Sequence, residues 1–470
     1  MKKRSTKLKW LGLTLASLGA VVSSGVMAAE ANNMQAESRG GIKIFNAADD
    51  SFWFSIGGRL NFDETFFAGG QQDKQSDYPT GGNIRRGLLK FAGGVGEYLT
   101  YNLTMNFDGS NARFEDAWIN ACSEYTGAIN QADLRFGQFT PPVSIDAWGS
   151  QGTVNDNVFL EPALATTAFS IPTKVYGVWA DASALDMFVL SAAAYHPKND
   201  LTDTVTSSNF NNTGRSDRLG GNVRLTFVPI HTEDTVFHVG AVGRYQAVNN
   251  ATSGGVATYQ PALFSTRPEA LARNTSALVN TGGTSGTASS TGIRARSYNI
   301  ATAEALAIMG PAFIEGEYYH ANVQRVPTIT DARTAGNPRF HGWHVEGGYM
   351  LTGESRGYDF MSGTLRNPKP ANSCGAWEIA ARYSYINLNS NNSIYGGSEH
   401  NTTIGVNWFV NENVRVAANY IRANIRPTGT ATVNGIANVP TGQPVTAPAG
   451  TQPVVKRQLD IFGVRFSVVF

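Results

Sequence analysis

The sequence has few charged residues, and no long apolar segment follows its first 28 positions. Asp, Glu, Lys and Arg make up 16% of the 470 residues, against about 25% in an average soluble domain. A helical membrane protein is excluded, because each spanning helix needs about 20 consecutive apolar residues. If this chain spans a membrane, it must therefore do so as a closed β-barrel, the only other structure that satisfies every backbone hydrogen bond in lipid.

The sequence also lacks an excess of basic charge. The stretch 1–28 holds five of the 37 Lys and Arg residues and no acidic residue. Without that stretch, 32 basic residues face 36 acidic ones, and the remaining chain has a net charge of −4. A nucleic-acid-binding protein has a net basic surface. The composition therefore argues against nucleic acid as a partner.

Motifs for catalysis or cofactor binding are missing as well. The chain has no phosphate-binding glycine loop ending in Gly-Lys-Ser/Thr, and no Gly-x-Ser-x-Gly. His341 and His344 would lie on opposite faces of a strand, so they are not expected to share a metal ion. We expect a protein that is not an enzyme and that has no cofactor and no metal site.

The first 28 residues have the organisation of a secretory signal peptide. Five bases precede an apolar run at 10–22, and the small residues Ala28, Ala29 and Ala31 follow it. We expect cleavage after Ala28, with the other two alanines as alternatives. An N-terminal periplasmic segment would then occupy 29–50.

Alternating apolar and polar residues recur along the rest of the chain. In 98–107, Leu99 and Leu103 share one strand face and Asn102 and Thr104 the other. The segments with this character are 52–62, 84–93, 98–107, 115–123, 133–139, 173–181, 185–195, 219–227, 235–246, 297–308, 312–320, 343–351, 377–385, 402–408, 413–425 and 460–470. The pattern predicts an all-β protein, a transmembrane antiparallel β-barrel of about 16 strands over 51–470. A secreted β-sandwich is the alternative.

Connections between these segments alternate between short and long. The short ones are 93–97, 181–184, 309–311 and 411–412, and the long ones are 68–83, 140–172, 196–218, 247–296, 321–340 and 427–456. Outer-membrane barrels have short periplasmic turns and long outer loops. The segment 353–376 is long although it falls at a short-turn position. It either folds into the barrel or marks an error in the strand count.

Six stretches, in order along the chain, resemble the phosphate-selective porin O and P family of outer-membrane proteins. They are 84–86 (IRR), 115–118 (EDAW), 136–142 (FGQFTPP), 349–355 (YMLTGES), 375–378 (GAWE) with 381–385 (ARYSY), and 404–408 (IGVNW) followed by 413–415 (NVR). The resemblance implies a 16-stranded outer-membrane barrel, usually a homotrimer in outer-membrane lipid. Its lumen would pass small inorganic anions, with phosphate or polyphosphate as candidate permeants. The terminal Phe470, on an outward-facing strand, also resembles the insertion signal of such barrels.

Basic residues that point inward are the candidate pore-lining and anion-binding residues. Arginine suits this role because its fixed fork of donors matches phosphate oxygens and stays charged. The alternation places six arginines inward: Arg59, Arg135, Arg224, Arg244, Arg382 and Arg465. The resemblance implies a central arginine cluster, at the positions Arg59, Arg85 and Arg135. The register at 84–93 leaves open whether Arg85 or Arg86 points inward, and Lys174 is a further candidate.

Acidic residues weaken the prediction of anion preference. The stretch 140–172 resembles the third outer loop, which in this family folds into the barrel and narrows it, and it contains Asp146, Asp156 and Glu161. Five more acids have inward parity: Asp108, Asp116, Glu315, Glu346 and Glu378. Alternatives to an anion channel are a general or weakly cation-preferring porin of the same fold, and a surface adhesin or structural barrel.

Cys122 and Cys374 are the only cysteines. Secreted proteins reach an oxidising compartment, where such a pair can form a disulfide. One hypothesis is a disulfide that fixes 353–376 to the inner wall. The alternative is two separate reduced cysteines.

Overall fold

The computed structural model describes residues 34–38, 41–47, 51–68, 80–108, 112–125, 128–147, 157–170, 174–197, 219–248, 250–253, 256–259, 261–271, 277–281, 293–326, 336–390, 394–426, 430–433, 436–440 and 457–470. The signal peptide expected at 1–28, Asp156, and large parts of the expected loops 196–218, 247–296 and 427–456 lie outside these residues. No helix in the described part of the chain is long and apolar enough to cross a membrane.

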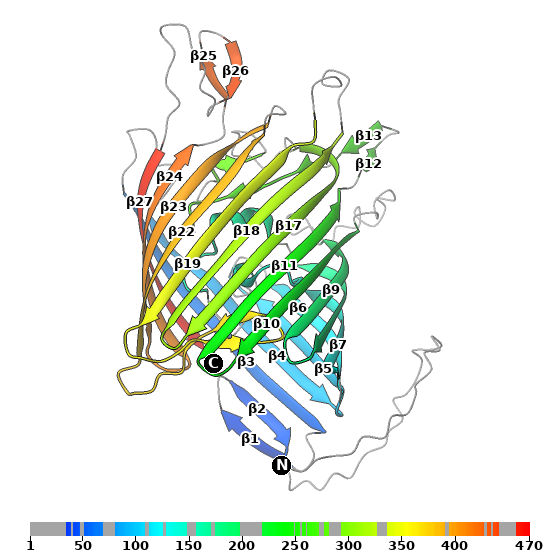
Figure 1. The fold of residues 1–470 in the computed structure, drawn as a ribbon, viewed down its shortest axis with the longest axis vertical. Coiled ribbons are helices and arrows are strands. Elements are labelled where there is room, and N and C mark those ends of the chain that lie inside the picture. Colours follow the sequence, from blue (N-terminus) through cyan, green and yellow to red (C-terminus); the bar gives the residue numbers. More distant parts are fainter. Residues whose placement is uncertain are drawn as a thin grey trace.

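Sixteen antiparallel strands form one closed barrel (Figure 1), which confirms the fold class and the strand number expected from the alternation. Each strand pairs with the next, and the last, β27, pairs with the first, β3. The barrel strands are β3 (Phe52–Ala68), β4 (Gly81–Val95), β5 (Leu99–Asn106), β6 (Arg113–Glu124), β7 (Ile129–Phe139), β8 (Val175–Ala184), β9 (Phe188–Pro197), β10 (Gly220–His231), β11 (Thr235–Ala247), β17 (Ile293–Met309), β18 (Ala312–Arg325), β19 (Arg339–Met350), β22 (Ala376–Ser390), β23 (Ile394–Phe409), β24 (Val414–Arg426) and β27 (Arg457–Val469).

The strands expose apolar side chains outward and bury polar ones inside. On β22, Ile379 and Tyr383 are exposed, whereas Arg382 and Ser384 between and beside them are buried. This follows from the two-residue period of a strand. An apolar outer surface is what a barrel in lipid requires.

The first strand is longer than the last strand that it pairs with. β27 pairs with β3 only from Arg59 to Ala68. The remaining edge of β3 pairs with β2 (Ile42–Asn46), which forms a hairpin with β1 (Met34–Ser38). Figure 1 shows this hairpin below the barrel, at the end with the short turns. It covers an edge that would otherwise present unpaired backbone groups.

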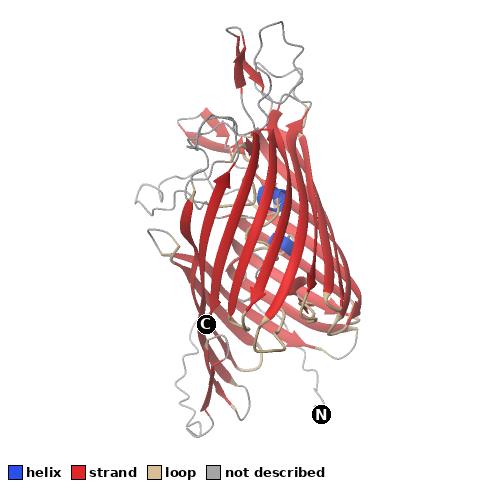
Figure 2. Ribbon diagram, turned by 90° about the vertical axis from the view of Figure 1, so that its left-hand side faces the viewer, coloured by secondary structure: helices blue, strands red, loops and turns tan. Residues whose placement is uncertain are grey.

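Three segments fold into the barrel interior. The first is the connection between β7 and β8, with the short helix α2 (Leu164–Phe169) that Figure 2 shows inside the barrel. The second comes from the long connection after β11 and includes β15 (Ser265–Thr266) and β16 (Val279–Asn280). The third is the hairpin of β20 (Gly357–Asp359) and β21 (Thr364–Arg366), which enters from the short-turn end.

Apolar side chains from these segments pack against the inner wall. Phe169 of α2 and Phe264 of the second segment lie in one buried cluster with Tyr319 and Phe340 of the wall. Leu365 of the third segment joins another cluster. The interior is therefore held partly by apolar burial, in addition to polar contacts.

The first and last strands of the barrel pack closely at Gly58, so a substitution at this residue tests how the barrel closes. Gly58 exchanges two backbone hydrogen bonds with Phe470, and an added Cβ would lie 2.3 Å from the Leu88 carbonyl oxygen. We expect Gly58→Ala to destabilise the barrel by about 1–3 kcal/mol, the usual cost of overpacking. The measurement is the temperature at which the folded form disappears on a heat-modifiability gel.

The matched control is Gly243→Ala, because a Cβ at Gly243 would meet no atom within 4 Å. The control should unfold at the wild-type temperature. Equal unfolding temperatures for the two variants would contradict this account of closure.

Candidate pore constriction

The connection between β7 and β8, which we call the constriction loop (described at 140–147 and 157–170), is bound to the inner wall of the barrel. Glu317 of β18 accepts hydrogen bonds from the Ser144 hydroxyl (2.9 Å) and the Ile145 amide (2.8 Å). Arg415 of β24 donates to the carbonyls of residues 157 and 158, at 2.9 and 2.7 Å. These contacts fix the loop to the wall at β18 and β24.

Glu161 of the constriction loop is the centre of an arginine cluster. Arg85 of β4 binds it through two nitrogens, at 2.6 and 2.8 Å. Arg465 of β27 binds Glu161 at 2.9 Å and also forms a bidentate pair with Asp63 of β3. The charge of Arg59 acts on Arg86 in the same region. We call Arg59, Arg85, Arg86 and Arg465 the arginine cluster. Its bound carboxylates are Glu161 and Asp63, and the charge of Glu115 also acts on Arg86. Four arginines therefore face three carboxylates, an excess of one positive charge.

A β-bulge brings both Arg85 and Arg86 inside. Asn61 of β3 pairs with Arg86, but the next residue, Phe62, pairs with Ile84, so that Arg85 has no partner across the ladder. A bulge of this kind lets two successive side chains lie on the same side of the sheet. The sequence left open whether Arg85 or Arg86 points inward. In the structure both side chains point inward.

Arg135 lies apart from the arginine cluster, between two tryptophans. Its guanidinium carbon is 4.1 Å from the ring centres of both Trp118 on β6 and Trp179 on β8. Its buried Nε has no hydrogen-bond partner. Gly137 makes this packing possible, because its φ is +134° and a Cβ there would lie 2.7 Å from Trp118 Cα.

The other predicted cations point inward but are engaged by protein groups. Lys174 contacts Asp116 at 3.2 Å and Thr140 at 2.7 Å. Arg224 pairs with Glu304 at 2.8 Å and donates to the Gly363 carbonyl of the third inward segment. These contacts give Lys174 and Arg224 a structural role.

Arg244 and Arg382 likewise hold the inward segments. Arg244 donates to the Phe169 carbonyl of the constriction loop, at 3.2 Å. Arg382 donates to the Glu161 carbonyl at 3.0 Å, and it pairs with Glu269 of the second inward segment, also at 3.0 Å. Glu269 was not expected from the sequence, because it lies in a long connection without a recognisable pattern.

The segment 353–376 folds into the barrel, one of the two outcomes that the sequence left open. Arg356 forms a bidentate pair with Glu378, at 2.6 and 2.8 Å. Tyr358 contacts His238 of β11 at 2.6 Å. Two more acids expected inside are also engaged: Asp108 pairs with Arg113, and Glu346 with Arg382.

The hypothesised disulfide is not formed in this structure, where Cys122 and Cys374 are both free. Cys122 lies on β6, whereas Cys374 is exposed directly before β22. In the strand order of the barrel, β6 and β22 are on opposite sides. The hypothesis rested on the expectation that both cysteines lie near the same end of the barrel. A shared end is not sufficient, because Cys122 and Cys374 lie on opposite sides of the barrel.

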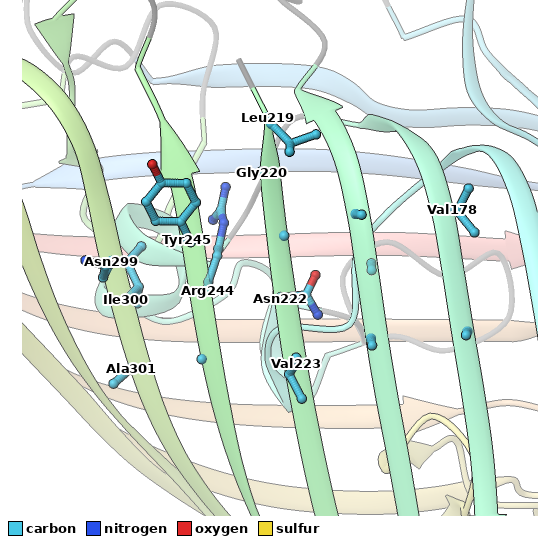
Figure 3. Close-up of a pocket in the computed structure, with 16 residues that line it drawn as sticks. Val178, Leu219, Gly220, Asn222, Val223, Arg244, Tyr245, Asn299, Ile300 and Ala301 are labelled. Carbon is cyan, nitrogen blue, oxygen red and sulfur yellow. The ribbon is translucent and has the colours of Figure 1, made fainter. Parts of the chain in front are cut away.

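An apolar trough on the barrel wall is separate from the pore. It has a volume of about 790 Å³ and crosses β8 to β11 and β17 (Figure 3). Its exposed lining residues Val178, Val223 and Tyr245 have the outward parity of their strands. The trough therefore lies on the outer face, among short side chains such as Ala192 and Ala301.

Comparison with known proteins gives a family match and several similar proteins. The family model described as phosphate-selective porin O and P matches residues 54–439. Porin O of Pseudomonas aeruginosa is 26% identical over 445 residues, which cover 88% of this chain and 93% of that protein. Among solved structures, OmpT of Vibrio cholerae has 12% identity and a TM-score of 0.48, covering 90% of this chain and 98% of that one. OprB of Pseudomonas putida, solved at high pH, has 9% identity and a TM-score of 0.44, covering 89% and 94%.

A closed 16-stranded barrel with an apolar outer face and a charged, loop-narrowed interior is an outer-membrane porin, a channel protein rather than an enzyme. The chain belongs to the phosphate-selective porin O and P family, as the six sequence stretches indicated.

Because Glu161 is bound by the arginine cluster, we expect its contribution to the free energy of unfolding to depend on pH. Burial alone would raise the pKa of the Glu161 carboxyl, but the charges of Arg85 and Arg465 and the hydrogen bonds from Arg85 outweigh it and lower the pKa to about 2. An ionised Glu161 therefore stabilises the fold above its ordinary pKa of 4.5, and this stabilisation is lost as the pH falls toward 2. We expect Glu161→Gln to cost about 3–5 kcal/mol at pH 7, because it leaves Arg85 without its carboxylate partner.

Thermal unfolding of wild type and Glu161→Gln between pH 7 and pH 2 measures this effect. The difference between them should shrink once the pH falls below about 4.5. Glu64→Gln is the control, because Glu64 is exposed on the outer face of β3. If the difference in unfolding temperature between wild type and Glu161→Gln stayed constant with pH, the expected role of the Glu161 charge would be contradicted.

Proposed function

We propose that this porin is a passive diffusion channel that prefers small anions, with phosphate-like oxyanions as the favoured class. The observation that carries the proposal is the arginine cluster, in which Arg85 and Arg465 bind the carboxylates of Glu161 and Asp63, and Arg59 and Arg86 add two further charges nearby. Charges at the narrowest part of a pore decide which ions enter it. A positive excess there favours anions.

Arg135 supports the oxyanion part of the proposal. Its stacking between Trp118 and Trp179 holds the plane of the guanidinium without consuming its N–H donors. A planar fork of donors held in place is well suited to two oxygens of one phosphate group. Chloride, which has no such pair of oxygens, would gain only from the charge.

The second candidate function is an unselective or weakly cation-preferring channel. Asp133 and Asp181 lie directly opposite one another on β7 and β8, close to Arg135, and both are only partly buried. Their charges offset that of Arg135. The balance between these acids and the arginines decides between the two functions.

Phosphate inhibition of the chloride current tests the role of Arg135. We expect Arg135→Ala to raise the phosphate concentration for half-inhibition roughly fivefold, since a unit charge about 4 Å from an ion contributes about 1 kcal/mol in water. Arg135→Lys, which keeps the charge and loses the fork, should lie between wild type and Arg135→Ala. The measurement is the single-channel current of each protein in a planar bilayer during phosphate titration.

The control is Arg422→Gln, which removes the same charge from the outward-parity face of β24. Phosphate should inhibit the chloride current of this variant at the same concentration as in wild type. Equal inhibition of wild type and Arg135→Ala would show that Arg135 is not part of the phosphate path.

We also propose that the protein works as a homotrimer in outer-membrane lipid, which rests on the family resemblance. Light scattering of the protein purified in detergent, corrected for bound detergent, should give three times the mass of one chain. A single-chain mass for protein that still conducts would contradict this proposal.

A further inference from the structure

Five ionisable side chains meet between the constriction loop and the barrel wall. Glu315 and Glu317 come from β18, His344 and Glu346 from β19, and Asp146 from the constriction loop. The strand register places Glu315 directly opposite Glu346 and Glu317 directly opposite His344. All five residues are buried.

The cluster brings four carboxyl groups together, and its surroundings supply few partners for them. Arg382 donates one long hydrogen bond, of 3.4 Å, to Glu346. Glu317 is bound by Ser144, the Ile145 amide and Tyr319, but Glu315 accepts no hydrogen bond from any described residue. Like charges directly opposite on paired strands repel, and an unpaired buried charge is costly. A cation bound between Glu315 and Glu346 would compensate the charges of both carboxylates and would give Glu315 a partner.

His344 points into this cluster with both ring nitrogens unsatisfied. Its side chain is fully buried, and neither Nδ1 nor Nε2 has a hydrogen-bond partner. Nε2 lies 3.7 Å from an oxygen of Glu315 and 3.9 Å from one of Glu317. Buried polar atoms are almost always hydrogen-bonded. An imidazole nitrogen aimed at two carboxylates without bonding either has the position of a metal ligand.

A small cavity adjoins the same carboxylates. It is lined by Asp146, Glu315 and Glu346, together with Thr364 and Leu365 of the third inward segment, and has a volume of about 20 Å³. Roughly 10–15 Å³ is enough for one water molecule. The cavity therefore has room for a single ion or for one water molecule that completes its coordination.

We propose that Glu315, His344 and Glu346 bind one divalent transition-metal ion of the zinc type, with Asp146 or Glu317 as a further ligand. The ligand atoms of Glu315, His344 and Glu346 lie within 4.8 Å of one another, and so do those of Asp146, Glu317 and His344. Zinc accepts imidazole and carboxylate together at about 2.0–2.2 Å. Calcium and magnesium prefer oxygen ligands only.

The bound ion would connect two parts of the channel that the strand ladder does not join. Asp146 belongs to the constriction loop, and Glu315 and Glu346 belong to the wall behind it. An ion between them fixes the loop to β18 and β19 and adds positive charge next to the constriction. The site is independent of the proposed anion preference, because metal binding can be measured without any current.

The test is zinc binding to the full-length protein, purified in detergent and first stripped with a chelator. Equilibrium dialysis against Zn²⁺, followed by elemental mass spectrometry, should find one zinc per chain in wild type. His344→Gln should weaken binding more than tenfold. The matched control is His238→Gln, which removes another buried inward histidine beside a glutamate, Glu304. It should bind zinc as wild type does.

A second variant keeps the test valid if His344→Gln does not fold. Glu315→Gln with Glu346→Gln keeps the side-chain shapes and removes the repulsion, so this double variant should fold without metal and bind no zinc. Dialysis against Mg²⁺ and Ca²⁺ should leave wild type without a stoichiometric ion. The proposal would be overturned if wild type bound zinc no more tightly than the double variant does. It would also be overturned if a folded His344→Gln variant bound zinc as tightly as wild type.

Discussion

A chain segment that crosses the inside of a barrel must find partners for its backbone carbonyls away from the strand ladder. In this porin, arginines of the wall supply those partners. Arg415 binds the Val158 carbonyl, Arg465 that of Leu160, and Arg382 that of Glu161. Buried carbonyls left unpaired would each cost a lost hydrogen bond or more. The position of the constriction loop depends on these contacts, and so does the shape of the remaining lumen.

This requirement divides the inner arginines by role. Those on β22, β24 and β27 serve the constriction loop, and Arg224 serves the segment that enters from the opposite end. Arg135 on β7 is held by aromatic rings instead. We propose that its N–H donors contact a solute in the lumen. The anion preference that we propose therefore depends on Arg135 together with the arginine cluster.

The sequence was sufficient to predict the barrel, because a two-residue period repeated sixteen times leaves little freedom in fold class. It also predicted the inward direction of Arg59, Arg224 and Arg382. It did not reveal which arginines are engaged, since their partners, such as Glu269 and the carbonyls of 157–169, lie in connections without periodicity. The inward position of both Arg85 and Arg86 depends on a bulge, which alternation alone does not show. The sequence placed Glu315, Glu346 and Asp146 inside but did not show that they meet His344, because these residues come from two strands and a loop.

The central claim is that the positive excess at the constriction outweighs the carboxylates elsewhere in the lumen. The most direct test is the zero-current potential of the wild-type protein in a planar bilayer separating two KCl concentrations. A potential with the sign of chloride selectivity is the result that this account predicts. A potential with the sign of potassium selectivity would contradict it and would show that acids such as Asp133 and Asp181 control the channel.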